Sequence, residues 1–164
     1  MQNILSVKAA DIVALLKGHG LKLACAESCT GGMISSAIVS VSGASAVLEL
    51  GVTSYTSRIK ESVLGVSADT LNTYGAVSRQ TAREMAVGIR RLASSDIGIS
   101  VTGVAGPEPC EGKAVGTVYI ALTDGKTITA QRLDIGNLDR TVIRETACLA
   151  VFELIENYVK EKIA

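Results

Sequence analysis

Apolar residues recur along the chain in two patterns, at helical spacing and in short continuous runs. Spacings of three and four residues predict helices within four segments: 9–16, 33–41, 82–93 and 143–159. Short apolar runs predict strands within three others: 21–26, 47–55 and 97–101. Because helices alternate with strands, the pattern favours an α/β fold in which helices cover both faces of a sheet. We therefore expect a three-layer α/β/α sandwich formed by a single domain of residues 1–164.

Two alternating segments in the second half of the chain predict a β-hairpin. Residues 115–123 and 127–133 alternate between apolar and polar positions around Asp124-Gly125, a dipeptide typical of tight hairpin turns. Hairpin strands run antiparallel, whereas strands joined through helices run parallel. The expected sheet is therefore mixed and mostly parallel, with about five or six strands.

Composition sets the character of the core. The chain has 164 residues, of which 48% are hydrophobic, yet only 3% are aromatic and none is Trp. A chain of this length can bury a core without disulfides or metal. The core must therefore be aliphatic, built from Ala, Val, Ile and Leu.

The charge balance disfavours partners that bind through strong electrostatic fields. Sixteen basic and sixteen acidic residues give zero formal net charge, and like charges form no block. We expect no binding to nucleic acid or to an anionic membrane. No apolar run reaches the ~18 residues of a membrane span, and Lys8 and Asp11 stand where a signal peptide would be apolar. The sequence predicts a soluble, cytoplasmic protein.

Cysteine and histidine usage argues against a metal centre. The chain has four cysteines, none in a Cys-x-x-Cys pair, and a single histidine, His19. Zinc sites draw their ligands from clusters of these two residue types. We therefore expect neither a metal nor another cofactor, and reduced thiols.

The most informative segment is the turn that follows the strand at residues 21–26. Ser28 and Cys29 come directly after it, and Thr30-Gly31-Gly32 opens the next helix. A sharp strand-to-helix turn exposes its side chains at the edge of the sheet, beside free N–H groups of the helix. Ser28 or Cys29 could thus be a nucleophile, with N–H groups near Gly31 and Gly32 holding an oxyanion or a phosphate. The alternative is a polar N-cap with glycines for close packing.

A second loop of small residues follows the strand at residues 97–101. Thr102 offers a hydroxyl there, and Gly103 and Gly106 allow close backbone approach. Ligands of open α/β sheets bind beside such loops, at the carboxyl ends of the strands. A tight structural turn is the alternative interpretation.

Three cations stand where a helix dipole disfavours them. Lys60 is expected in the first or second turn of a short helix, and Arg140 and Arg144 begin the last helix. Each such cation costs about 0.3–1 kcal/mol at an exposed site. At the two arginines, either nearby carboxylates offset this cost or an anion binds there. For Lys60 the alternative to a nearby anion is an ordinary surface lysine.

Taken together, six motifs resemble one family, the CinA C-terminal domain or nicotinamide-nucleotide amidohydrolases. The motifs are Ala26-Glu27-Ser28-Cys29-Thr30-Gly31-Gly32, Thr53-Ser54-Tyr55 with Lys60, Gly75-Ala76-Val77-Ser78, Thr102-Gly103-Val104-Ala105-Gly106-Pro107, Val115-Gly116-Thr117-Val118, and Asp139-Arg140 with Arg144. They occur in the family's order and cover nearly the whole chain. Two-domain members carry a further N-terminal domain, so the chain resembles the stand-alone form.

The resemblance implies hydrolysis of the carboxamide of nicotinamide mononucleotide to nicotinate mononucleotide and ammonia, in pyridine nucleotide recycling and without metal. By motif, Ser28 would be the nucleophile and Lys60 its general base, while Tyr55 and Thr102 would support this pair and the oxyanion. Arg140 and Arg144 would bind the nucleotide end. The remaining expected substrate-binding residues lie in the two loops: Thr30, Gly31, Gly32, Gly103 and Gly106.

The chain departs from the family pattern at residues 108–114, where members usually have a glycine-rich stretch and a Lys-Pro. This leaves a rival hypothesis, a pyridine-nucleotide-binding module that is catalytically weak or inactive. A third hypothesis makes Cys29 the nucleophile. We also expect a homo-oligomer, a dimer or larger, because many cytoplasmic enzymes of this size are symmetric oligomers.

Overall fold

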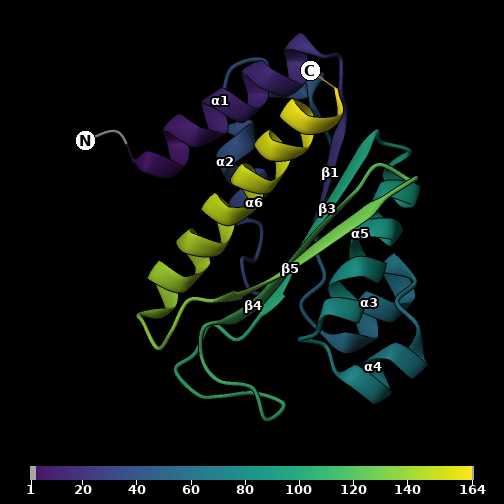
Figure 1. Ribbon diagram of the computed structural model, residues 1–164, viewed down its shortest axis with the longest axis vertical. Coiled ribbons are helices and arrows are strands. Elements are labelled where there is room, and N and C mark those ends of the chain that lie inside the picture. Colours follow the sequence, from purple (N-terminus) through teal and green to yellow (C-terminus); the bar gives the residue numbers. More distant parts are fainter. Residues whose placement is uncertain (1–2, 164) are drawn as a thin grey trace.

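The computed structural model describes residues 3–163, which form a sheet between two groups of helices (Figure 1). In chain order the elements are α1 (Ile4–Gly18), β1 (Leu23–Glu27), α2 (Met33–Val39), the 3₁₀ turn η1 (Ala44–Ala46), β2 (Leu48–Thr53), α3 (Ser57–Leu64), α4 (Ala68–Tyr74), α5 (Arg79–Ala93), β3 (Ile97–Gly103), β4 (Thr117–Thr123), β5 (Ile128–Asp134) and α6 (Arg140–Lys162). Figure 1 shows α1, α2 and α6 on one face of the sheet and α3, α4 and α5 on the other. The predicted α/β/α arrangement is confirmed.

Within residues 3–163 the sheet has five strands in the order β2-β1-β3-β4-β5. β1 pairs in parallel with both β2 and β3, while β4 runs antiparallel to β3 and to β5. Only β4 therefore opposes the common direction among these five strands. The predicted hairpin about Asp124-Gly125 joins β4 to β5, and the mixed, mostly parallel sheet is confirmed.

The two faces of the sheet carry side chains of different size. In β1, Leu23 and Cys25 belong to the large aliphatic core under α1, α2 and α6, whereas Ala24 and Ala26 face the α5 side. The small residues let α5 pack close to the strands: a Cβ on Gly98 would lie only 2.4 Å from a backbone oxygen of α5. Strict alternation along β1 thus assigns successive side chains to opposite layers.

Connections diverge at the carboxyl end of β1. After β1 the chain enters α2 on one face, and after β2 it enters α3 on the other (Figure 1). In open α/β sheets such a divergence leaves a crevice at the strand ends. The residues that follow β1, β2 and β3 therefore meet at one edge of the sheet. None of the helices in the described part of the chain combines the length and apolarity required to cross a bilayer.

Candidate active site

Glu27 and Ser28 are neighbours in sequence but serve opposite layers of the fold. Glu27 ends β1 and its carboxylate is bonded to α2, whereas the Ser28 hydroxyl is bonded to Lys60 of α3. The Ser28 amide donates to the Val101 carbonyl at 3.0 Å, which extends the ladder between β1 and β3 by one residue. The period-two alternation of the strand thus continues into the turn and directs Ser28 toward the α3 side.

Glu27 occupies the N-terminus of α2, which corrects an expectation from the sequence. Its fully buried carboxylate accepts hydrogen bonds from the amides of Gly32, Ile34 and Ser35 at 2.9–3.1 Å. The hydroxyls of Thr30 and Ser35 donate to it as well. Because free helix N–H groups attract anions, a carboxylate is well placed there.

Consequently the amides near Gly31 and Gly32 do not point at a ligand, as the sequence had suggested. The Gly31 amide donates to the Ser28 carbonyl, and the Gly32 amide and the Thr30 hydroxyl donate to Glu27. Among the described residues these three, Thr30, Gly31 and Gly32, do not line the cavity at Ser28. Their part is to shape the turn. A carboxylate three residues before a Thr-Gly-Gly helix start is the sequence signal that could have assigned Glu27.

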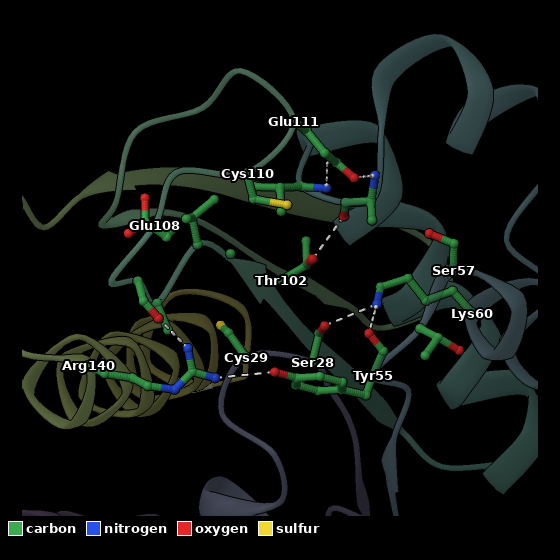
Figure 2. Close-up of a pocket in the computed structure, with 17 residues that line it drawn as sticks. Ser28, Cys29, Tyr55, Ser57, Lys60, Thr102, Glu108, Cys110, Glu111 and Arg140 are labelled. Carbon is green, nitrogen blue, oxygen red and sulfur yellow. Dashed lines mark hydrogen bonds between the residues drawn. The ribbon is translucent and has the colours of Figure 1, made fainter.

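Lys60 is buried rather than a surface lysine. Its side chain is only 1% exposed, and Nζ lies 3.0 Å from Ser28 Oγ. Nζ also donates to the carbonyls of Ser54, at 2.7 Å, and Tyr55, at 3.4 Å. These contacts join α3 to the turn after β1, across 32 positions of sequence. Figure 2 shows the pair at one end of the cavity.

The surroundings of Lys60 lower the pKa of its amine, which favours a role as a base. Burial lowers the pKa of Lys60 from 10.5 to about 8, while Cys29 and Glu111 nearby partly oppose this shift. A buried ammonium loses hydration, so its neutral form is favoured. An amine with such a pKa has an appreciable neutral fraction near physiological pH and can accept the proton of a hydroxyl.

A cavity of about 380 Å³ opens above Ser28 and Lys60. Its wall is formed by the ends of β1, β2 and β3, the segment before α5, the 108–114 loop and the start of α6 (Figure 2). Its lining residues are Ser28, Cys29, Tyr55, Thr56, Ser57, Lys60, Ala76, Val77, Thr102, Gly103, Val104, Ala105, Gly106, Glu108, Cys110, Glu111 and Arg140. All expected catalytic residues are therefore in one place, together with Gly103, Gly106 and Arg140.

Thr102 and Tyr55 take different positions in this cavity. The Thr102 hydroxyl is buried and donates to the Ala76 carbonyl at 2.8 Å. The Tyr55 side chain is 59% exposed and its phenol oxygen accepts from Arg140 at 3.2 Å. Tyr55 thus lies between the Ser28 end and the Arg140 end of the cavity, as Figure 2 shows.

The two arginines of α6 differ in what they contact. Arg140 lines the cavity and donates only to neutral oxygens, those of Gly106 and Tyr55. Arg144 lies outside the cavity lining and donates to the carbonyls of Cys29 and Thr30 at 3.0 and 2.9 Å. Arg140 therefore lies where a substrate-binding arginine was expected. Arg144 instead holds the turn that carries Ser28 through two backbone carbonyls. Neither forms an ion pair with a carboxylate among the described residues.

Cys29 is poorly suited to act as the nucleophile. Its thiol is 5% exposed, and burial raises its pKa to about 11. The thiolate is the reactive form of cysteine, so Cys29 is inert near neutral pH. Its backbone amide donates to no other residue within residues 3–163, and Cys29 lines the same cavity. The other buried thiols, Cys25 and Cys148, lie in the aliphatic core.

The sequence of this chain matches the profile of a known protein family. The profile of the CinA C-terminal domain matches residues 6–159. The chain belongs to the CinA C-terminal domain family. A putative competence-damage inducible protein of Thermoanaerobacter pseudethanolicus is 43% identical over 149 residues, which is 90% of this chain and 36% of that protein. The chain thus spans about a third of the length of such relatives.

Solved CinA-superfamily structures share the whole fold. A competence/damage-inducible protein from Agrobacterium tumefaciens is 34% identical with a TM-score of 0.91, covering 96% of both chains. A competence damage-inducible protein from Klebsiella pneumoniae is 31% identical with a TM-score of 0.94, covering 98% of this chain and 99% of that one. The names of these CinA proteins state no reaction.

Proposed function

We propose that this CinA-family chain hydrolyses the carboxamide of nicotinamide mononucleotide, giving nicotinate mononucleotide and ammonia. The observation that carries the proposal is the 3.0 Å contact between Ser28 Oγ and a buried Lys60 amine whose pKa is lowered to about 8. A hydroxyl paired with a base that is partly neutral near pH 7 is the arrangement of a serine–lysine hydrolase. The substrate comes from the family resemblance.

In the first half-reaction, Ser28 Oγ attacks the carboxamide carbon while its proton passes to Lys60 Nζ. The carbonyl oxygen becomes an oxyanion, and the amide of Cys29, which donates to no other described residue, is our candidate donor for it. Lys60 then returns the proton to the amide nitrogen, the carbon–nitrogen bond breaks and ammonia leaves. The product on the enzyme is a nicotinoyl ester of Ser28.

In the second half-reaction, water attacks the ester and gives its proton to Lys60. The ester bond breaks, Lys60 protonates Ser28 Oγ, and nicotinate mononucleotide is released. Lys60 therefore acts as base and acid in turn, which its pKa of about 8 permits. The carbonyls of Ser54 and Tyr55 hold its amine in place throughout.

The opposite end of the cavity suits the nucleotide part of this substrate. Arg140 presents a guanidinium whose partners are neutral oxygens, so a phosphate would be its first anionic partner. Gly103 and Gly106 line the same cavity, and the Gly106 carbonyl accepts from Arg140. If the phosphate of nicotinamide mononucleotide binds Arg140, the ribose spans the cavity and the carboxamide of the base lies near Ser28.

The test is ammonia release from nicotinamide mononucleotide by wild type, Ser28→Ala and Lys60→Ala. We expect release by wild type and near-abolition in both variants. Binding without turnover in all three proteins would favour the rival binding module. Undiminished release in Ser28→Ala, with loss in Cys29→Ala, would instead identify Cys29 as the nucleophile.

A further inference from the structure

The 108–114 loop, which departs from the family pattern, folds back on itself in a tight turn. Cys110 and Lys113 exchange backbone hydrogen bonds of 2.8 and 3.2 Å, and the two residues between them have positive φ values. This is the two-residue hairpin pattern in which both central residues are left-handed. Gly112 adopts that conformation freely, but Glu111, at φ 54°, does so at a cost.

The carboxylate of Glu111 has partners that offset this cost. It accepts hydrogen bonds from the amides of Ala76 at 2.9 Å and Val77 at 3.0 Å. Lys113 lies 3.4 Å from the same carboxylate and donates to the Tyr74 carbonyl at 2.9 Å. The turn is thereby fastened to the 74–77 segment, 34 or more positions away in sequence.

Gly75 makes the contact possible. It has a φ of 85°, and a Cβ at this position would lie 2.4 Å from a carboxylate oxygen of Glu111. The exposed amides that follow Gly75 form a small anion-binding concavity just before α5 begins. In this chain that concavity is filled by a side chain of the loop itself.

The fastened segments are walls of the cavity over Ser28. Ala76, Val77, Cys110 and Glu111 all line it, and Figure 2 shows the Glu111 carboxylate at the far side from Ser28. Ala76 is also the acceptor for the Thr102 hydroxyl. The loop, the 74–77 segment and the end of β3 are therefore one hydrogen-bonded unit.

We infer that Glu111 is a positioning residue: it fastens the turn at residues 110–113 to the amides of Ala76 and Val77 and so preforms the cavity wall that holds substrate. This inference rests on the proposed function for the identity of the substrate. Because Glu111 contacts the wall and not the Ser28 hydroxyl, its loss acts on substrate affinity, and kinetics measured at a pH above the titration of Lys60 are free of its charge effect on that residue. A loop that is ordered before substrate arrives loses no conformational entropy on binding, so the binding free energy is more favourable.

The test combines steady-state kinetics with limited proteolysis by trypsin, which cleaves after Lys113. In Glu111→Ala we expect KM for nicotinamide mononucleotide to rise about tenfold with kcat within about threefold, and cleavage after Lys113 to be at least about tenfold faster. Glu111→Gln, which keeps one acceptor oxygen, is expected between Glu111→Ala and wild type. Glu108→Gln is the matched control, since it removes a carboxylate from the same loop and should leave cleavage at the wild-type rate.

The inference is overturned if Glu111→Ala is cleaved after Lys113 at the wild-type rate. It is also overturned if cleavage is faster but KM is unchanged, or if only kcat falls. A wild type that releases no ammonia would refute the proposed substrate. The cleavage comparison would still decide whether Glu111 fastens the wall.

Discussion

The amine of Lys60 lies 3.0 Å from the hydroxyl oxygen of Ser28, inside a site where the lysine is 1% exposed. Two elements far apart in sequence create this contact: the turn after β1 presents the serine, and the second turn of α3 presents the lysine. Two backbone carbonyls, those of Ser54 and Tyr55, fix the amine without a carboxylate. The geometry therefore supplies a base whose charge is not pinned by an ion pair.

Activity should depend on pH through Lys60. Burial lowers its pKa to about 8, and the neutral amine is the form that accepts the Ser28 proton. We expect kcat/KM to rise with pH to a plateau, with a midpoint of about 8. A profile that stays level from about pH 6 to 9 would contradict Lys60 as the base.

The same profile should respond to Glu111. Its carboxylate raises the pKa of Lys60, as Cys29 does, while Arg140 and Glu108 are the other charged groups of the cavity. Removing the Glu111 charge in Glu111→Gln therefore favours the neutral amine, and the midpoint should move to lower pH.

Lys60 should also make folding stability depend on pH. Its pKa is about 8 in the folded state and 10.5 as the reference for the unfolded chain, so the unfolded state binds more protons between these values. Stability contributed by this residue is lowest below pH 8 and rises through that window. Relative to Lys60→Met, wild type should gain about 2–3 kcal/mol in free energy of unfolding between about pH 7.5 and 10.5. Urea unfolding of both proteins at the two pH values checks this, and a constant difference contradicts it.

Much of the fold could be predicted because local pattern and burial agree. The runs in β1 and β3 are apolar since both faces of those strands are covered, and Asp124-Gly125 forms the hairpin turn that its sequence favours. Ser28 could be singled out because a strand-to-helix turn exposes its side chains. These features depend on residues that are close in sequence.

The rest depends on contacts that spacing does not encode. Nothing near Lys60 in sequence indicates that α3 packs with this residue inward, so the local pattern by itself favours a surface lysine. Glu27 was missed because its partners are the amides of α2, which the glycines had seemed to reserve for a ligand. Arg140 and Arg144 lie one helical turn apart in α6, so one reaches Tyr55 and the other reaches the turn at Ser28. Sequence spacing does not show which of them faces the cavity.

Glu27→Gln should destabilise the fold and disturb the Ser28 turn. One acceptor oxygen becomes an NH₂ group that faces amides or hydroxyls of α2, and the charge at the helix N-terminus is lost. We expect a loss of about 2–4 kcal/mol in free energy of unfolding, together with a lower kcat. Urea unfolding measures the first and ammonia release the second.

Glu49→Gln provides the control for this change. Glu49 is exposed on β2, so the same loss of charge should alter stability by less than about 0.5 kcal/mol. If both substitutions changed the free energy of unfolding equally, the hydrogen bonds of Glu27 would not contribute measurably to stability.

Cys29→Ala should leave the reaction largely intact. The substitution keeps the backbone amide and removes a thiol whose pKa is raised to about 11 by burial. We expect kcat/KM within about threefold of wild type, because an un-ionised thiol is not a nucleophile. Iodoacetamide at pH 7 should label the exposed Cys110 well before Cys29, as peptide mass spectrometry would show.

Arg140 and Arg144 should give opposite kinetic signatures when each is changed to Met. Arg140 lines the cavity beside Tyr55, so its loss should raise KM for nicotinamide mononucleotide about 10–100-fold with little change in kcat. Arg144 holds the carbonyls of Cys29 and Thr30, so its loss should lower kcat and stability while KM changes little. Arg91→Met, on the exposed side of α5, removes the same charge far from the cavity and should behave as wild type. If Arg144→Met raised KM and Arg140→Met did not, the phosphate would have to be assigned to Arg144 and the cavity would have to extend beyond its present lining.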